Sequence, residues 1–202
     1  MAITYPLTFP TDPVPADFDL VFEPNVGMSR SIYSDNVQTY EHDRLVWGAA
    51  VTMPTMWDAT KGREFHGFFT ALRGQAGTFT MILPDHASPR GTQNANFNVK
   101  TTTAIRSETL ECDGLTVGAT LLTGDMISVD NRLYMIMEDA TADGSGAATL
   151  TLSHGLRAEA TATDAVTCIN PVGTWRLSSN GVVRQTNNVN HVNFNFSMVE
   201  AV

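Results

Sequence analysis

The stretch "LTGDMISVDNRLYMIM", residues 122–137, predicts a β-hairpin and points to the fold class of the whole chain. Apolar and polar residues alternate in two short runs, and the turn-forming pair Asp130-Asn131 lies between them. The apolar positions are Ile127, Val129, Leu133, Met135 and Met137. Because side chains alternate between the two faces of a strand, this pattern predicts that one face of the hairpin is buried.

The register of this hairpin depends on the length of its loop. A two-residue loop sets Val129 opposite Arg132. A three-residue loop instead sets Val129 opposite Leu133. It also sets Ile127 opposite Met135, so apolar residues meet apolar residues across the hairpin. We therefore expect the three-residue loop, with Val129 facing the interior.

The composition is that of a folded globular protein. The chain has 202 residues, of which 43% are hydrophobic and 16% are charged, whereas disordered chains have few apolar residues and a high net charge. No apolar run reaches the roughly 18 residues of a membrane-spanning helix, and residues 1–6 lack the basic and apolar parts of a signal peptide. We expect that the chain folds in a cytoplasm and does not insert into a membrane.

The net charge of −9 argues against binding to DNA or RNA. Proteins that bind a duplex present clustered Lys and Arg side chains that replace the counterions of the phosphates. We expect no sequence-specific binding of nucleic acid. A surface that repels phosphate would suit a passage through which DNA slides without sticking.

Short strands are predicted before residue 54, after a Pro-rich N-terminal segment, residues 1–16, that serves as a docking segment or a loose tail. Turn residues at Gly27 and Asp35-Asn36 separate the strands. The strand-like stretches are "DFDLVFE" (17–23), "SRSIYS" (29–34), "VQTYEHD" (37–43) and "RLVWGAAVTM" (44–53). One face of the last stretch is apolar, with Leu45, Trp47, Ala49, Val51 and Met53. Strands of this length with frequent turns indicate an antiparallel sandwich.

One α-helix is predicted at about residues 58–73. Its apolar stripe has the i, i+3, i+4, i+7 spacing of a helix face and ends before Gly74. The stripe consists of Phe65, Phe68, Phe69 and Leu72. Thr55 to Asp58 resembles a capping box with Asp in place of Glu, which is a weak start signal.

The order of these patterns predicts an all-β protein, mainly β with one α-helix, in two structural units. Residues 1–95 together with 173–202 form a tube-like β-sandwich scaffold, and residues 96–172 form an inserted small β-barrel module. The strands of the module are expected at about 97–105, 108–112, 125–129, 133–138, 147–152 and 164–170. The strongly alternating stretch "HVNFNFSMVEA" (191–201) returns the chain to the first sheet.

Catalytic and metal-binding signatures that are local in sequence are absent. The histidines, His42, His66, His86, His154 and His191, form no ligand motif, and there is no nucleophile elbow, phosphate loop or dinucleotide fingerprint. Cys112 and Cys168 lie far apart, outside any C-x-x-C pattern, and are interpreted as structural thiols. We expect no enzyme activity, with no catalytic residue, no cofactor and no metal.

Two acidic stretches imitate functional sites. In "DATADG", Asp139, Thr141, Asp143 and Gly144 match early positions of a calcium loop, but Leu150 stands where the loop needs a bidentate Glu. A polar turn, with Gly144 and Gly146 supplying positive φ, explains the stretch better. The neighbouring carboxylates Glu138 and Asp139 point to opposite faces of a strand, so they are interpreted as solvated charges and not as a glycosidase pair.

Tyr134 carries the alternative function. On the face opposite Leu133, an exposed Tyr134 could stack on a sugar ring, which would make the chain a carbohydrate-binding module for host recognition. The competing interpretation places the ring in a barrel wall or an interface.

Three stretches carry a resemblance to a known family. They are "ALRGQAGTFTMILPDHASPRG" (71–91), "VGATLLTGDMISVDNRLYMIMEDATADGSGAATLTL" (117–152) and "FNFSMVEA" (194–201). Together they resemble the distal tail proteins and related minor tail proteins of long non-contractile-tailed bacteriophages and of gene transfer agents. The first stretch is the most specific, and the chain lacks the extra carbohydrate-binding domain of the larger members.

The resemblance implies a structural protein of the virion, located at the tail tip and assembled in the host cytoplasm. Such proteins form a ring, usually a hexamer, that joins the tail tube to the hub or fibre complex and lets DNA pass. The implied partners are further copies of the chain, the tail tube protein, the tail hub or central fibre protein, and the tape measure protein. We expect the Pro-rich segment and the 190–200 strand to supply the contacts between copies.

Overall fold

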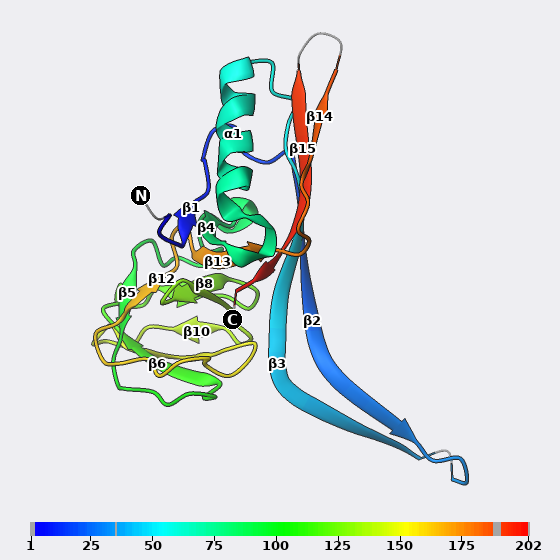
Figure 1. The fold of residues 1–202 in the computed structure, drawn as a ribbon. Helices are drawn as coiled ribbons and strands as arrows, with labels where there is room; N and C mark the ends of the chain where they lie inside the picture. Colours follow the sequence, from blue (N-terminus) through cyan, green and yellow to red (C-terminus); the bar gives the residue numbers. More distant parts are fainter. Residues whose placement is uncertain (1–2, 35, 188–190, 202) are drawn as a thin grey trace.

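The computed structural model describes residues 3–34, 36–187 and 191–201, and only the backbone of residues 25 and 41–44. The described chain is mostly β-strand with a single α-helix and curled sheets, so the predicted all-β class with one helix is confirmed. Two sheets carry most of the strands, and the helix lies against the first of them (Figure 1).

The first sheet has seven strands and gathers segments from both ends of the chain. Its order is β1-β4-β13-β15-β3-β2, and β14 pairs with β15 off this path. The strands are β1 (Leu7–Thr8), β2 (Asp17–Arg30), β3 (Val37–Thr52), β4 (Thr78–Ile82), β13 (Val172–Leu177), β14 (Val183–Thr186) and β15 (Val192–Glu200). All pairs are antiparallel except β1 with β4.

The helix α1 (Ala59–Leu72) covers the inner face of this sheet, as its predicted stripe requires. Phe65, Phe68, Phe69 and Leu72 are all buried. The Asp58 side chain accepts a hydrogen bond from the Thr60 backbone N–H at 2.7 Å, so Asp58 is the N-cap. The capping box predicted from Thr55 is therefore wrong, since Asp58 itself begins the helix. Arg73, with φ of 54°, ends it before a 3-10 turn, η1 (Gly74–Ala76).

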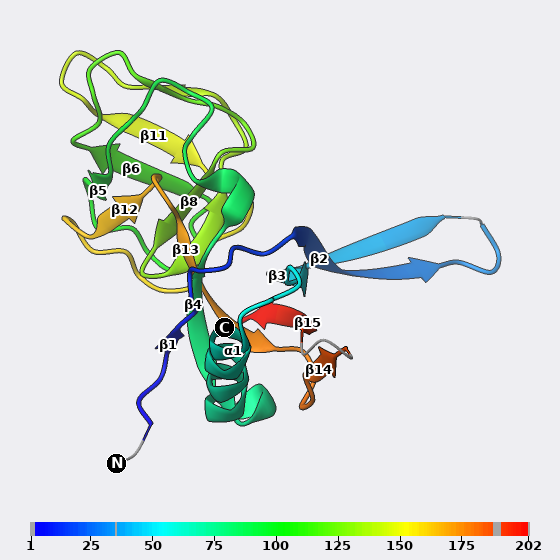
Figure 2. The ribbon, with the colours of Figure 1, turned by 90° about the horizontal axis from the view of Figure 1, so that it is seen from above.

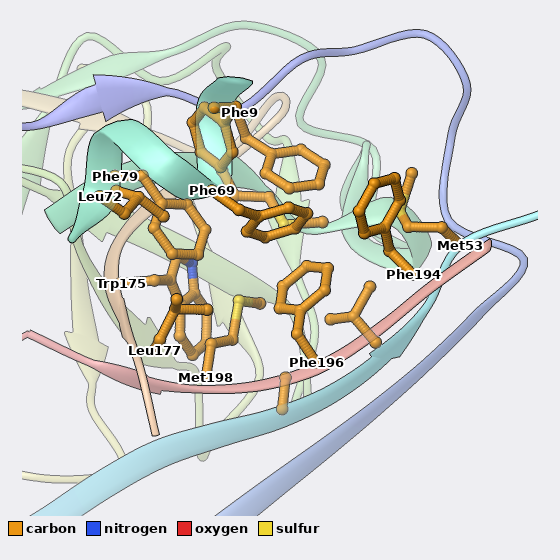
Figure 3. Packing of buried hydrophobic residues seen from close by; sticks show 14 of the residues in the cluster. Phe9, Met53, Phe69, Leu72, Phe79, Trp175, Leu177, Phe194, Phe196 and Met198 are labelled. Atoms are coloured by element: carbon orange, nitrogen blue, oxygen red, sulfur yellow. The ribbon is translucent and has the colours of Figure 1, made fainter. Parts of the chain in front are cut away.

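Aromatic side chains fill the space between α1 and the sheet (Figure 3). Phe69 packs on Phe194 and Phe196 of β15, with ring centroids 5.4 and 4.9 Å apart. Phe9 of the N-terminal segment contacts Phe65 and Phe68 from the other side. Three of these four ring pairs are edge-to-face, an arrangement that adds to the burial of apolar area. The Pro-rich segment is thus docked on its own chain.

The second sheet lies between residues 97 and 167. Its order is β11-β6-β5-β12-β8-β9, and a two-stranded β7-β10 pair lies beside it. The strands are β5 (Phe97–Val99), β6 (Thr109–Asp113), β7 (Thr120–Leu121), β8 (Met126–Val129), β9 (Arg132–Met135), β10 (Ala140–Thr141), β11 (Ala148–Thr151) and β12 (Ala165–Thr167). A bridge between Ile136 and Leu152 joins the chain after β9 to the chain after β11, so the sheet curls onto itself.

These two sheets have separate hydrophobic clusters, but the β8–β9 hairpin takes part in both. Met126 and Leu133 pack into the cluster of the first sheet, while Ile127 and Tyr134 pack into that of the second. A 3-10 turn, η2 (Pro84–His86), precedes the second sheet. The division of the chain at residues 96 and 172 remains a prediction about independent units.

The register predicted for the β8–β9 hairpin is wrong. Val129 pairs with Arg132 and Ser128 with Leu133, so the loop has two residues. Asp130 and Asn131 have φ of 50° and 57°, the left-handed values of a type I′ turn. Apolar matching failed as a criterion because both faces of β8 are buried. Apolar side chains of β8 are therefore covered in either register, and matching them across the hairpin does not select one. Turn geometry decided the pairing instead.

The short strands predicted between residues 17 and 52 are also wrong, because β2 and β3 form one long hairpin. Gly27 lies inside β2 and does not turn the chain. A β-bulge between Pro24 and Asn25 shifts the register and keeps the ladder going to the pair Arg30 and Val37. The apolar face predicted for residues 44–53 is confirmed, since Trp47, Ala49, Val51 and Met53 are buried.

No helix in the described part of the chain is long and apolar enough to cross a membrane.

Candidate interaction surface

The end of the β2–β3 hairpin projects away from the rest of the protein, and we call residues 21–47 the arm (Figures 1 and 2). Strand β3 pairs with β15 only at residues 48–52. Beyond that point the arm is a two-stranded ribbon. Such a ribbon is marginally stable in water unless something covers one of its faces.

Large apolar side chains are exposed all along the arm. Of the sixteen exposed large hydrophobic residues in the described part of the chain, eight lie between residues 21 and 47. They are Val21, Phe22, Val26, Met28, Ile32, Tyr33, Val37 and Tyr40. Scattered apolar residues are normal on a protein surface, but a concentration of this kind marks a contact site.

Both faces of the arm carry apolar groups. Val26 pairs with Glu41 and Met28 pairs with Thr39, so Val26 and Met28 share one face; Met28 is 73% exposed. Tyr40 lies on the other face, where its hydroxyl donates to Gln38 Oε1 at 3.0 Å. The tip carries Ile32 and Tyr33, which are 94% and 98% exposed. The arm can therefore bury area against more than one neighbour.

The root of the arm is fixed to the protein by specific contacts. Trp47 is buried, and its indole N–H donates to the Leu133 carbonyl at 3.2 Å. Phe22 packs edge-on against Trp47, with ring centroids 6.2 Å apart. The Leu45 carbonyl accepts a hydrogen bond from the Arg157 guanidinium. These contacts set the direction in which the arm leaves the sheet.

The outer face of the first sheet, opposite α1, carries small and polar side chains. Ser197, Ala50 and Asp19 form one row across β15, β3 and β2. Neighbouring residues surround a shallow hollow of about 610 Å³, whose walls include Glu23, Gly48 and Arg176. Val21, Val46 and Val199 also line the hollow, so the face mixes apolar with small and polar side chains.

A buried polar cluster joins the two sheets behind the arm. Arg157 Nη2 lies 3.2 Å from Glu200 Oε2, and both side chains are largely withdrawn from solvent. Glu200 Oε1 accepts a hydrogen bond from the Leu133 N–H at 3.2 Å. Burial raises the pKa of Glu200, although Arg157 and the backbone N–H groups oppose that shift. The cluster thus links the end of β15 to the β8–β9 hairpin.

Tyr134 and His154 complete this cluster. The two rings are stacked with centroids 4.8 Å apart, and the Tyr134 hydroxyl accepts from the Arg157 backbone N–H at 3.2 Å. Arg157 Nε donates to His154 Nε2 at 3.3 Å. His154 therefore has a structural role in this cluster. Burial raises the pKa of Tyr134.

Tyr134 is only 1% exposed, so it cannot serve as a platform for a sugar ring. The placement in a barrel wall is the one that the structure shows. The carbohydrate-binding alternative loses the residue on which it was based.

The acidic residues singled out in the sequence are turn and strand caps. Asp143 Oδ1 accepts hydrogen bonds from Ser145 and Ala147, which lowers the pKa of Asp143 to about 2. Asp139 accepts from Thr123, which lowers its pKa, and Glu138 accepts from the Thr151 hydroxyl. Gly146 has positive φ as predicted, whereas Gly144 does not. The interpretation of this stretch as a polar turn therefore holds, but only one of its two glycines, Gly146, has positive φ.

The histidines and cysteines are dispersed. His66 lies on the exposed side of α1, His86 lies 3.5 Å from Asp85, and His191 stacks on the exposed ring of Trp57. The His42 side chain lies outside the described residues. Among the residues that the structure describes, no three His, Cys, Asp or Glu side chains are placed to hold a metal ion.

Cys112 and Cys168 are buried free thiols, which confirms their structural interpretation. Burial raises the pKa of Cys112 to about 12 and that of Cys168 to about 11. Neither thiol is poised to react at neutral pH.

The segments expected to join copies of the chain are both occupied within one copy. Strand β15 is a central strand, paired with β3 on one side and with β13 and β14 on the other. Its apolar face, which includes Phe194 and Met198, lies in the core. The edges and the inner face of β15 are therefore already used within one copy, and contacts between copies through the 190–200 strand stay a prediction. The Pro-rich segment packs under α1 and beside β4.

Sequence reasoning missed the arm, although the sequence contains its signal. Alternation continues through Gly27 to Arg30 and resumes at Val37, with Asp35-Asn36 as the turn residues between the strands. Two long strands joined by one turn should have been preferred to four short ones. No pattern in the sequence predicts that the arm is exposed.

No family model and no curated protein matches this chain.

Proposed function

We propose that the chain is a structural subunit of a bacteriophage-like tail tip, a distal tail protein that forms a ring between the tail tube and the hub or fibre complex. The observation that carries the proposal is the exposed apolar arm, which has a use only when other protein chains cover it. The sequence resemblance supplies the kind of assembly. The proposed partners are further copies in a hexameric ring, the tube protein, the hub or central fibre protein and the tape measure protein.

The distribution of surface chemistry supports this role. A subunit that assembles needs apolar area at its edges, and the arm offers it on both faces. A closed ring uses two different patches of each subunit, one meeting the other on the neighbour. The arm is one such patch, because it stands clear of the body of its own chain (Figure 1).

The outer face of the first sheet is the surface that we propose for the DNA passage. Its small side chains leave room, and the carboxylates Asp17, Asp19 and Glu23 repel phosphate, although Arg176 lies on the same face. The overall charge of −9 has the same sign. No catalytic step is part of this proposal, and the subunit acts through its shape and its contacts.

The mass of the purified chain in solution tests this proposal. Light scattering over a concentration series, with negative-stain images of the largest species, should show a closed ring of copies. The ring should also bind the proposed tail tube protein. A chain that stays monomeric at high concentration and binds neither tube nor hub protein would contradict the proposal.

A further inference from the structure

The tip of the arm carries two large side chains that are not packed against their own chain. Ile32 and Tyr33 are almost fully exposed, and the loop that carries them is closed by a hydrogen bond from the Ser31 N–H to the Asn36 carbonyl at 3.0 Å. Ile32 and Tyr33 therefore form a knob at the end of a hydrogen-bonded ribbon. Aromatic and aliphatic anchors of this kind dominate the energetics of protein interfaces when they enter a pocket.

A matching apolar groove lies on the opposite side of the protein. It runs between the N-terminal segment and the end of β4, and its volume is about 350 Å³. Its walls include Phe9, Val14, Pro15, Ile82, Pro84 and Val172. Val14 is 61% exposed, and Ile82 is also exposed. Among the described residues, β1 covers this edge of β4 only at Phe79 and Thr80, which leaves the groove open beyond them.

The arm cannot reach the groove of its own chain. Figures 1 and 2 place β1 and the arm on opposite sides of the body in two perpendicular views. The arm is a ladder-paired ribbon that points away from the groove, and its root is fixed by Trp47 and Leu45. Any contact between knob and groove must therefore join two copies.

The exposed area of the whole arm, summed over both faces, is of the size that contacts between copies need. A buried aromatic side chain removes about 150–250 Å² from water, so Phe22, Tyr33 and Tyr40, at 60%, 98% and 57% exposure, retain roughly 300–550 Å². A standard interface takes about 800 Å² from each partner. The aliphatic residues Val26, Met28, Ile32 and Val37 supply much of the remainder.

We propose that the Ile32–Tyr33 knob of one copy docks in the groove between the N-terminal segment and β4 of a second copy. The contact deepens the proposed function and rests on it, since it names the two patches that join neighbours. Knob and groove are different surfaces, so the contact is heterologous and repeats from copy to copy until a ring closes. The Pro-rich segment then has two roles: it packs on its own core and receives the neighbouring arm.

Disulfide trapping between two singly substituted chains tests this contact. One chain carries Tyr33→Cys and the other carries Val14→Cys; the natural Cys112 and Cys168 are buried and do not compete. Mixing the two under mild oxidation should give a mixed disulfide dimer on a non-reducing gel, several-fold more than either chain alone. Ile105→Cys, exposed in the turn between β5 and β6, replaces Val14→Cys in the control mixture and should give little product.

The outcomes separate this inference from the proposed function. Equal trapping in both mixtures, or dimers of the Tyr33→Cys chain with itself, would overturn the docking of knob in groove. If the natural chain assembles but Tyr33 and Val14 are never trapped together, the docking falls while the ring proposal stands. If the natural chain does not assemble at all, the proposed function falls first.

A double substitution at the knob gives a second readout. Ile32→Asp with Tyr33→Asp should weaken self-association by on the order of tenfold or more, because the anchors of the interface are lost. The melting temperature of the monomer should not change, since neither side chain has a partner in its own chain. Unchanged self-association would contradict the proposal.

Discussion

The β8–β9 hairpin and the β2–β3 hairpin arise from similar alternating sequences, yet one is buried on both faces and the other stands in solvent. All four residues of β8 are buried, and its hairpin contributes to both hydrophobic clusters. The arm of the β2–β3 hairpin is joined to the body by contacts at its root, where Trp47 and Leu45 are hydrogen-bonded. Alternation predicts a strand and its two faces, but it does not predict which chain will cover a face.

The largest expected difference between the two hairpins comes from a charge placed on each. Ile127→Asp puts an unpaired carboxylate where the side chain is fully buried and should lower the free energy of unfolding by about 3–5 kcal/mol. Met28→Asp, on the exposed arm, should change it by less than about 0.5 kcal/mol. Urea unfolding of both variants measures the difference, and equal losses would break the comparison.

Arg157→Met tests the buried cluster that holds the short hairpin to β15. Removing the guanidinium leaves the Glu200 carboxylate buried without a cation, which should cost about 3–5 kcal/mol near neutral pH. Arg176→Met, on the exposed outer face, is the matched control and should be nearly neutral.

The cost of Arg157→Met should depend on pH. Burial already raises the pKa of Glu200 above its usual 4.5, so the folded state keeps this proton to a higher pH than the unfolded chain does. The stabilisation that the raised pKa gives to the folded state is therefore lost as the pH rises from the pKa of Glu200 in the unfolded chain through its pKa in the folded protein. Loss of Arg157 raises the pKa further, so the variant should recover stability as the medium becomes acidic. A loss that is constant from about pH 4 to about pH 7 would contradict this explanation.

A smaller effect is expected at the turn of the short hairpin. Asn131 has φ of 57°, which a β-branched residue tolerates poorly, so Asn131→Val should cost about 1–2 kcal/mol. Ser34→Val, in the exposed loop of the arm, should cost less than about 0.5 kcal/mol. Thermal unfolding compares them. If both substitutions were equally harmless, the turn would not be what fixes the register.

Strong periodic patterns predicted the fold well. The apolar stripe of Phe65, Phe68, Phe69 and Leu72 predicted the helix to within one residue at each end. Only a helix places all four of these side chains on one buried face. Each of the six stretches expected in the second sheet overlaps an observed strand. The two-residue strands β7 and β10 were missed because they are too short for a period.

Other features depend on contacts that a local pattern cannot contain. The register of β8–β9 follows from the left-handed turn at Asp130 and Asn131, not from matched apolar pairs. The ion pair of Arg157 and Glu200 joins residues more than forty positions apart. The arm is a candidate interaction site because its large apolar side chains are exposed. The sequence of a single chain does not show which apolar side chains its own fold leaves exposed.

Shortening the arm tests the central claim most directly, that the long hairpin serves contacts between chains and the short one serves the fold. Replacing residues 25–44 by a two-residue Asn-Gly turn joins Pro24 to Leu45, which are already paired, and leaves the root intact. Light scattering and thermal unfolding of this chain should show a folded monomer with the melting temperature of the natural monomer. A chain that still assembles to the natural mass, or that no longer folds, would contradict the claim.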